Sequence, residues 1–374
     1  MKKILVILES RASYGYSKNL INFLKNEKKI KVKTLVTGTH LCKELGLSIN
    51  NIIKDKIKID YKLSFDKENF SNGIGKLISS FSKILKIFKP NIVIIFGDRV
   101  ELMGIAISCC YSNNIALAHV QAGDRSGHID DMTRMSLAKL SHIHFPATQK
   151  AQERLISLGE DKKRIFLVGA PQLDDIELDK ILKKKNILIH KKKVNLSEEY
   201  VILLQHPVFK DQKNSDEIYK KTINALKKIN YKTYIIYPNY DPGYKKIIDI
   251  IKKQRIKNIE IFKNLNRQDF LALAAHSSAL VGNSSSGILE SPSLKIPVVN
   301  IGDRQQFREQ NKNILNAEYN EKDIYLKIKK AINMKKKIKN IKNLHGDGKS
   351  SKRIFRILKK IKINKFILNK NTTY

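Results

Sequence analysis

Short apolar runs alternate with longer amphipathic stretches along the first half of the chain. Runs rich in Ile and Val predict buried strands, and stretches with apolar residues at helical spacing predict helices. The predicted strands are Ile4–Leu8, Val32–Val36, Asn91–Phe96, Ile115–Val120, Ile143–Ala147 and Ile165–Val168, and the predicted helices are Tyr16–Lys25, Gly75–Phe88 and Leu102–Tyr111. Pro90 should end the second helix, because proline cannot continue the hydrogen-bond ladder. This alternation predicts a parallel sheet covered by helices on both faces, with right-handed crossovers.

A second alternating series follows a change of pattern at Gly169–Pro171. The lysine-rich stretch Lys180–Lys193 predicts an exposed helix and linker. Beyond it, the predicted strands are Tyr200–Leu204, Thr233–Tyr237, Ile259–Phe262, Ala279–Val281 and Val298–Ile301, and the predicted helices are Ser215–Ile229, Tyr244–Gln254 and Asp269–His276. The chain beyond Asn340 predicts a basic terminal helix.

A chain of 374 residues is longer than one typical core requires, so we expect two α/β domains. The pattern divides into residues 1–170, residues 171–350 and a basic tail at residues 351–374. Ligands of open parallel sheets bind outside the carboxyl ends of the strands. Two domains of similar size therefore favour a binding cleft between them.

The net charge of +37 invites a nucleic-acid interpretation. The lysines, however, are spread over almost every predicted helix, whereas nucleic-acid binders gather basic residues on one face with interleaved aromatic side chains. We therefore expect no nucleic-acid partner. The concentration at Lys327–Lys365 leaves contact with a polyanion or an acidic membrane surface open as an alternative for that segment.

The three cysteines, Cys42, Cys109 and Cys110, have the spacing neither of a disulfide framework nor of a metal site. The apolar start Met1–Leu8 is too short for a signal peptide, and no stretch reaches the length of a membrane span. We expect a cytoplasmic protein that is not associated with a membrane.

Carboxylates follow two predicted strands of the first half, namely Asp98, Glu101, Asp124, Asp130 and Asp131. Crowded carboxylates drive their pKa values apart, which supplies one acid and one base. Arg134 lies four residues after Asp130, so the two side chains would share a helix face. A purely structural ion pair between them is the alternative to a catalytic one.

The polar run Gly282–Gly287 follows a predicted strand and precedes a predicted helix. Backbone N–H groups and hydroxyls at a helix N-terminus form an anion site, and Glu290, one turn into that helix, is placed to accept from ribose hydroxyls. His206 and Arg304 add donors that match phosphate geometry. Helix N-capping by Ser284–Ser286 is the structural alternative. The run is not a dinucleotide or ATP motif, so we expect a nucleoside diphosphate.

A series of motifs runs in order through residues 2–360: Ser10–Gly15, Thr37–Leu41, Phe96–Arg99, Ser126–Asp131 with Arg134, Lys139–His142, Leu204–Val208, Tyr237–Asp241, Gly282–Ser285, Asn300–Gln305 and Gly346–Lys349. In this order they resemble the hydrolysing UDP-N-acetylglucosamine 2-epimerases, which include the bacterial enzymes that begin sialic and legionaminic acid synthesis. The resemblance implies two facing Rossmann-like domains of the GT-B type, with the active site in the interdomain cleft. It also implies a nucleotide-sugar substrate, a homo-oligomer (dimer or tetramer) and no metal or redox cofactor.

The family's reaction expels UDP from the anomeric carbon while the C2 proton is removed, giving a 2-acetamidoglucal. Water then adds at C1, and a proton returns to C2 from the other face. The resemblance implies that the catalytic residues are Asp98, Gln121, Asp124, Asp130, Asp131 and Arg134. The residues it implies for the substrate and its nucleotide are Arg11, Arg99, His206, Asn239, Asn283, Ser284, Ser285, Glu290 and Arg304.

Two positions depart from the family's pattern. Gln121–Asp124 stands where the family usually has Glu-Gly-Gly-Glu, and Met135 replaces a histidine. A glutamine cannot relay a proton, so Asp124 or Asp131 must take that role, or the site is altered. These changes suit a subgroup with another sugar, such as a UDP- or GDP-linked di-N-acetylated bacillosamine. A GT-B glycosyltransferase and an inactive nucleotide-sugar binding protein are the alternative functions.

Overall fold

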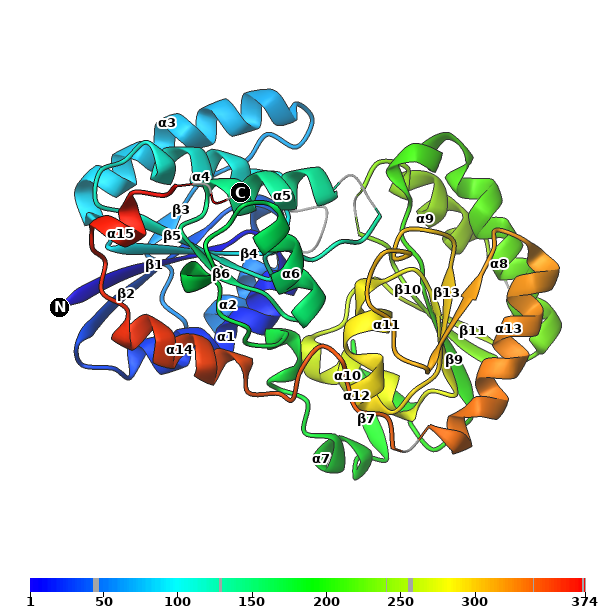
Figure 1. Ribbon diagram of the computed structural model, residues 1–374. Coiled ribbons are helices and arrows are strands. Elements are labelled where there is room, and N and C mark those ends of the chain that lie inside the picture. The colour runs from blue at the N-terminus through cyan, green and yellow to red at the C-terminus, as the bar shows by residue number, and fades with distance from the viewer. Residues whose placement is uncertain are drawn as a thin grey trace. The chain divides into compact units, whose positions relative to one another are not determined.

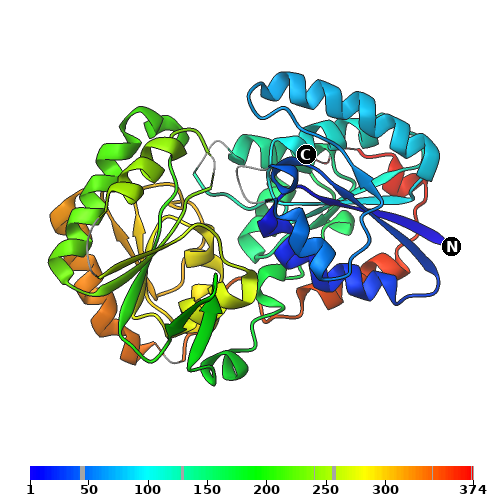
Figure 2. The same cartoon turned by 180° about the vertical axis from the view of Figure 1, so that it is seen from behind.

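The computed structural model describes residues 1–42, 47–127, 130–239, 241–254, 258–338, 340–371 and 373. The chain forms two compact α/β units (Figures 1 and 2). Unit 1 consists of Met1–Arg125, Ile129–Asp175 and His345–Tyr374, and unit 2 consists of Ser126–His128 and Ile176–Leu344. The C-terminal part of the chain therefore returns to unit 1, where Figure 1 draws it in red on the same unit as the blue N-terminal strand.

Unit 1 is built on a parallel sheet with the strand order β3-β2-β1-β4-β5-β6 among the described residues. Its strands are β1 (Lys2–Leu8), β2 (Ile30–Val36), β3 (Tyr61–Lys62), β4 (Ile92–Phe96), β5 (Ala116–Val120) and β6 (Ile143–Phe145). The order reverses between β1 and β4, which is where ligands bind in doubly wound sheets. Leu8 pairs with Val36 and Phe96 pairs with Val120, so the strands end together at one edge of the sheet.

Helices cover both faces of the sheet of unit 1. They are α1 (Arg11–Lys25), α2 (Ile49–Lys54), α3 (Phe70–Phe88), α4 (Glu101–Cys110), α5 (Asp130–Leu140), α6 (Gln149–Ser157), α14 (Ser350–Lys360) and α15 (Lys365–Leu368), with 3₁₀ helices at Gly38–Leu41, Lys162–Arg164 and Pro171–Leu173. Successive strand residues point to opposite faces. Ile4 and Val6 thus pack with α1 and α14, whereas Leu5 and Ile7 pack with α3 and α4.

Local sequence explains where two of these helices begin or end. Ser10 and Ser13 form a reciprocal capping box at the start of α1. Helix α3 ends at Phe88, and Lys89 takes a left-handed conformation with φ of 49° directly before Pro90. The predicted stop at Pro90 is confirmed.

Unit 2 repeats the parallel architecture with the strand order β11-β10-β9-β12-β13-β14. Its strands are β9 (Tyr200–Leu204), β10 (Lys232–Ile236), β11 (Ile259–Phe262), β12 (Ala279–Gly282), β13 (Val298–Ile301) and β14 (Ile314–Ala317). Its helices are α7 (Leu178–Leu182), α8 (Ser215–Ile229), α9 (Tyr244–Lys253), α10 (Arg267–His276), α11 (Ser285–Leu289), α12 (Ser291–Leu294) and α13 (Glu321–Met334), with 3₁₀ helices at Phe209–Asn214 and Lys335–Lys337. The two parallel six-stranded sheets establish the predicted GT-B-like fold class.

Three local predictions are wrong. Ile165 makes one isolated bridge to His144, and Ile165–Val168 is not a strand. The expected exposed helix at Lys180–Lys193 is the short helix α7 followed by an antiparallel hairpin of β7 (Asn186–Ile189) and β8 (Lys192–Asn195). Glu290 does not lie one turn into a helix, because it stands between α11 and α12.

Within the described part of the chain, no helix combines the length and the apolar composition needed to cross a membrane.

Candidate functional site

One buried arginine gathers the carboxylates that follow the strands of unit 1. The Arg134 side chain is 2% exposed, and its Nη1 lies 2.7 Å from Oδ1 of Asp131. Its Nη2 forms an ion pair with Asp98, and Nη1 also donates to the backbone carbonyl of Asp124 at 3.2 Å. The structure therefore brings together the carboxylates of Asp98, which follows β4, and of Asp131, in the first turn of α5, with the backbone carbonyl of Asp124, which follows β5. We call these residues, with Arg134, the acidic edge.

The ion pair within α5 joins residues three positions apart, Asp131 and Arg134. Asp130 opens the same helix. Arg134 also reaches Asp98, which is 36 positions away in sequence and belongs to another element. The spacing of residues along the helix therefore did not predict the contacts of Arg134 with Asp98 and Asp131.

A second pair of buried carboxyl groups lies beside the acidic edge. Glu9 directly follows β1, and Glu101 opens α4; both are almost fully buried. Burial and, to a smaller extent, the nearby Glu101 side chain raise the pKa of Glu9 to about 8, so Glu9 is neutral at pH 7. Arg99 lies with its Nε 3.5 Å from Glu101. Sequence reasoning did not select Glu9 as a site residue, although its position directly after a buried strand was a usable signal.

Gln121 lies in the turn after β5, and His119, which belongs to β5, contacts the turn after β4. Gln121 is 6% exposed and has a left-handed φ of 63°, which is uncommon for a residue other than glycine and is typical of functional turns. Burial lowers the pKa of His119 to about 3, so its neutral ring donates from Nε2 to the carbonyl of Gly97 at 2.7 Å. That bond holds the turn immediately before Asp98.

In unit 2, Asn283 fixes the backbone of His206. Its Oδ1 accepts from the N–H of His206 at 2.7 Å, and its Nδ2 donates to the carbonyl of His206 at 2.9 Å. The N–H of Asn239 donates to Nδ1 of the His206 ring at 3.0 Å. Because Nδ1 accepts a hydrogen bond there, the neutral ring carries its proton on Nε2 and can donate from that atom.

Arg304 is joined to the same group of residues. It is 9% exposed, lies 3.4 Å from Asp241 and donates to the carbonyl of Asn283 at 3.3 Å. Asn239 donates to the same Asp241 carboxylate at 2.8 Å. We call His206, Asn239, Asp241, Asn283 and Arg304 the polar edge.

The close approach of β12 to β9 explains the glycine before Asn283. Gly282 has a φ of 133°, and a Cβ at this position would lie 2.1 Å from the carbonyl oxygen of Leu204. Only glycine avoids this clash. The glycine lets Asn283 lie beside His206, which is two residues beyond the end of β9.

Of the serines after Gly282, Ser284 caps a helix, which was the structural alternative to anion binding. Ser284 is the N-cap of α11, and its hydroxyl accepts from the N–H of Ser286 at 3.4 Å. Ser285 opens that helix. Glu290 is 4% exposed and forms an ion pair with Arg267 at 2.7 Å. Arg267 was not predicted, because it belongs to α10 and no local motif marks it.

Arg11, a predicted substrate-binding residue, and Met135, which departs from the family's pattern, both lie in helices of unit 1. Arg11 opens α1, but its side chain lies outside the described part of the structure. Met135 lines a surface hollow of about 720 Å³ between α4 and α5, together with Ile107 and Leu140. Among the described residues, no group of three or more His, Cys, Asp or Glu side chains could hold a metal ion.

Comparison with known proteins gives consistent matches. The model of the UDP-N-acetylglucosamine 2-epimerase family matches residues 22–359. The UDP-N,N'-diacetylbacillosamine 2-epimerase (hydrolyzing) of Legionella pneumophila is 33% identical over the full length of both chains. The GDP/UDP-N,N'-diacetylbacillosamine 2-epimerase (hydrolyzing) of Campylobacter jejuni is also 33% identical, over 86% of each chain. The crystal structure of the UDP-GlcNAc 2-epimerase from Neisseria meningitidis bound to UDP-GlcNAc has a TM-score of 0.79 at 20% identity, covering 96% of this chain and 100% of that one.

Proposed function

Because the chain belongs to the UDP-N-acetylglucosamine 2-epimerase family, we propose that it is a hydrolysing nucleotide-sugar 2-epimerase whose substrate is a UDP-linked N,N'-diacetylbacillosamine-type sugar. The products are UDP and the free manno-configured sugar, which is a precursor for nonulosonic acids of the legionaminic type. Two relatives that are 33% identical carry this substrate in their names, which supports the choice of sugar. UDP-N-acetylglucosamine is the alternative substrate.

The proposed reaction is an elimination followed by a hydration. A base removes the C2 proton while the C1–oxygen bond breaks, and UDP leaves with the bonding electron pair. Water then adds to C1 of the 2-acetamidoglucal, and a proton is delivered to the opposite face of C2. One water molecule is consumed for each UDP and free sugar formed.

The acidic edge carries the proton transfers in this proposal. Asp98 removes the C2 proton, and Asp131 returns a proton to C2 from the other face. Arg134 contacts both carboxylates and keeps them at fixed positions while their charges change. Asp124 lies in the same group and supplies the carboxylate that Gln121 lacks. Glu9, being neutral at pH 7, adds no further negative charge beside this site.

The polar edge binds the nucleoside diphosphate in this proposal. Nε2–H of His206 donates to a phosphate oxygen, and the guanidinium of Arg304 supplies positive charge nearby. Donors that are already in place stabilise the charge that develops on departing UDP without a reorganisation cost. Arg11, Arg99, Ser284 and Ser285 are proposed to add further donors to the substrate, and Glu290 to accept from the ribose.

The observation that carries the proposal is the contact of one buried guanidinium with Asp98 and Asp131 at the carboxyl ends of a parallel sheet. Carboxylates that are held in place beside a substrate can act as general bases and acids, taking a proton and returning one. This arrangement fits the reaction of the family, in which a proton is removed from C2 of the sugar and a proton is later returned to C2.

The test is product analysis with a panel of UDP- and GDP-linked 2-acetamido sugars. We expect NMR to show free manno-configured sugar and UDP in equal amounts from the UDP-linked diacetylated substrate, with slower turnover of UDP-N-acetylglucosamine. Sugar that appears only on an added acceptor would instead indicate a glycosyltransferase. UDP binding without any product from the whole panel would contradict enzymatic function.

A further inference from the structure

The C-terminal residues beyond α14 are held on unit 1 by a buried arginine. Arg164 is 2% exposed and donates to the carbonyls of Phe366, Ile367 and Asn369, at 2.6 Å for Ile367 and 3.0 Å for Asn369. Its guanidinium also lies 4.8 Å from the centre of the Phe366 ring. These carbonyls close the C-terminal end of α15, where helix carbonyls have no partner within the helix. Arg164 therefore fixes the position of the backbone directly before Lys370.

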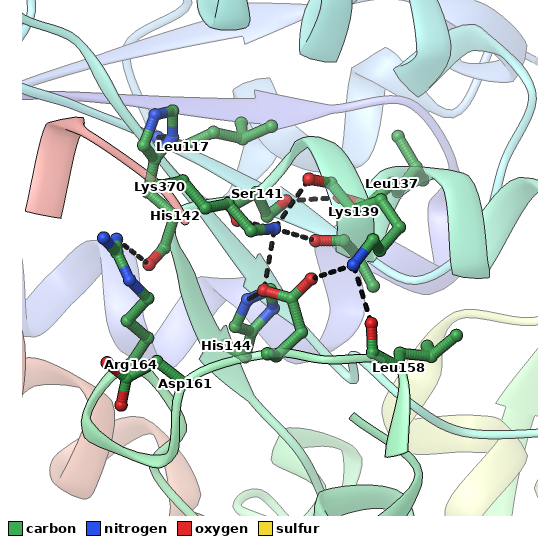
Figure 3. Close-up of polar contacts among 12 residues, drawn as sticks. Leu117, Leu137, Lys139, Ser141, His142, His144, Leu158, Asp161, Arg164 and Lys370 are labelled. Atoms are coloured by element: carbon green, nitrogen blue, oxygen red, sulfur yellow. Dashed lines mark hydrogen bonds and ion pairs between the residues drawn. The ribbon is translucent and has the colours of Figure 1, made fainter. Parts of the chain in front are cut away.

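Lys370 points into a group of four acceptors at the C-terminal end of α5 (Figure 3). Its Nζ lies 3.0 Å from the carbonyl of Ala138, 2.6 Å from that of Lys139 and 2.8 Å from that of Ser141. The last turn of a helix carries partial negative charge, and a cation placed there is stabilising. Lys370 is thus the C-terminal cap of α5, although it lies some 230 positions later in the sequence.

The fourth acceptor, Glu160, balances the buried ammonium. Its Oε2 lies 2.7 Å from Nζ of Lys370 and 2.9 Å from Nε2 of His144. Burial raises the pKa of Glu160, but the hydrogen bond from His144 and the charge of Lys370 outweigh burial and hold that pKa below its usual range. Glu160 is therefore ionised at neutral pH, and the partly buried Lys370 has a fully buried counter-ion. We call Arg164, Glu160 and Lys370 the clamp.

The opposite end of α5 carries the acidic edge. Asp131 lies in the first turn and Arg134 in the next, while the clamp contacts the last turn of the same 11-residue helix. A helix of that length spans about 16 Å, and its backbone hydrogen bonds connect the two ends. A shift of α5 along its axis would change the contact of Arg134 with Asp98, which belongs to a different element.

Resting on the proposed function of the acidic edge, we propose that Lys370 is a positioning residue that sets the placement of α5 and, through it, of Asp131 and Arg134. It touches no reacting atom. A misplacement of catalytic groups by about 1 Å can cost roughly 100-fold in rate, so a cap at the far end of the helix can control turnover. The clamp also explains why a basic C-terminal segment is packed on unit 1.

The first test is steady-state kinetics of Lys370→Met, which keeps the aliphatic stem and removes the ammonium. We expect kcat to fall by at least about 10-fold while KM and the affinity for UDP change by less than about threefold. Lys362→Met, at an exposed position before α15, is the matched control and should equal the parent protein. If Lys370→Met does not fold, Lys370→Gln, which keeps two N–H donors, undergoes the same measurement. A folded Lys370 variant with kcat within twofold of the parent overturns the proposal.

The second test separates positioning from general support of the fold. In the Arg134→Lys background, Lys370→Met should lower kcat by less than about threefold, because the two residues act through the same helix. Independent, multiplicative losses would overturn the proposal. Hydrogen exchange should quicken in residues 131–140 of Lys370→Met and not throughout unit 1, and a uniform increase would equally overturn it. If the parent protein turns over no nucleotide sugar, the proposed function fails, whereas the exchange measurement still tests the mechanical link.

Discussion

At the carboxyl edge of the first sheet, one buried guanidinium is shared between two carboxylates, whereas at the carboxyl edge of the second sheet one asparagine fixes the backbone of His206 and another contacts its ring. Arg134 contacts Asp98 and Asp131 directly, so a change in the charge of either carboxylate acts on the same guanidinium. His206 is fixed through its backbone and Nδ1, with its proton on Nε2. The first arrangement suits proton transfer, and the second suits a fixed hydrogen-bond donor.

The difference supports the proposal that the two edges have different roles in one reaction. Parallel sheets place polar residues at the same edge in both units, but the residue types decide what each edge can do. Carboxylates can take and return protons as general bases and acids. Donors that are already in place, such as the His206 ring and the Arg304 guanidinium, stabilise the charge on a leaving diphosphate. Substitutions at the two edges should therefore affect different kinetic constants.

The largest effect is expected for Asp98→Asn. This change keeps the shape of the side chain and removes the group proposed to take the C2 proton, so kcat should fall by about 1,000-fold. The affinity for UDP, measured by calorimetry, should remain within about twofold of the parent value. Retention of full turnover would show that Asp98 is not the base.

Arg134→Met should lower both activity and stability. Loss of the guanidinium leaves Asp98 and Asp131 without their shared counter-ion; their side chains are 23% and 20% exposed, so the expected loss is moderate, about 2 kcal/mol in the free energy of unfolding. Urea denaturation measures this loss, and kcat should fall by roughly 100-fold. Arg356→Met, at an exposed position on α14, should leave both quantities unchanged. Equal stability of the two variants would argue against the shared counter-ion.

At the polar edge, Asn283→Asp should weaken UDP binding by about 10-fold. The substitution removes the donor to the carbonyl of His206 and adds negative charge where a diphosphate is proposed to bind. The value of kcat at saturating substrate should change far less than KM. Asn195→Asp, at an exposed position of the β7–β8 hairpin, serves as the control. A fall in kcat with unchanged UDP affinity would reverse the roles assigned to the two edges.

The smallest effect on turnover, but a distinct one on stability, is expected for Glu9→Gln. The folded protein holds a proton on Glu9 up to about pH 8, whereas the unfolded chain releases it near the ordinary pKa of 4.5. Between these values the folded state binds more protons, so Glu9 lowers the free energy of unfolding as pH rises, by at most about 1.4 kcal/mol per pH unit. Glu9→Gln lacks this slope and should gain stability relative to the parent from about pH 5 to pH 8. Parallel stability curves would contradict the raised pKa.

Much of the fold follows from local sequence patterns, because most strands and helices have strong periodicity. Ser215–Ile229 and Val298–Ile301 have the predicted bounds. The β7–β8 hairpin was missed because its turn uses His190 and Lys191 at positive φ, where Asn or Gly would have given the usual signal. Strand β14 was missed because Ile314–Ala317 is short and includes an asparagine.

The candidate site was less accessible from local patterns. Residue types at strand ends pointed to Asp98, His206 and Asn283, and the structure gives each of them polar partners within its own unit. The pairing of Asp98 with Arg134 depends on tertiary packing and leaves no spacing rule in the chain. Glu290 was misplaced because a separate short helix, α12, begins at Ser291 immediately after it, with Pro292 in its first turn. The contact of Lys370 with α5 depends on the return of the chain to unit 1, which no local pattern encodes.

The central claim is that carboxylates of the acidic edge remove and return a proton at C2 of a nucleotide-linked sugar. Turnover in deuterium oxide, followed by NMR of the released sugar, tests it most directly. If these carboxylates act as proposed, the free manno-configured sugar carries deuterium at C2 in every molecule, because the returned proton comes from solvent. Free sugar that retains its original hydrogen at C2 would contradict it.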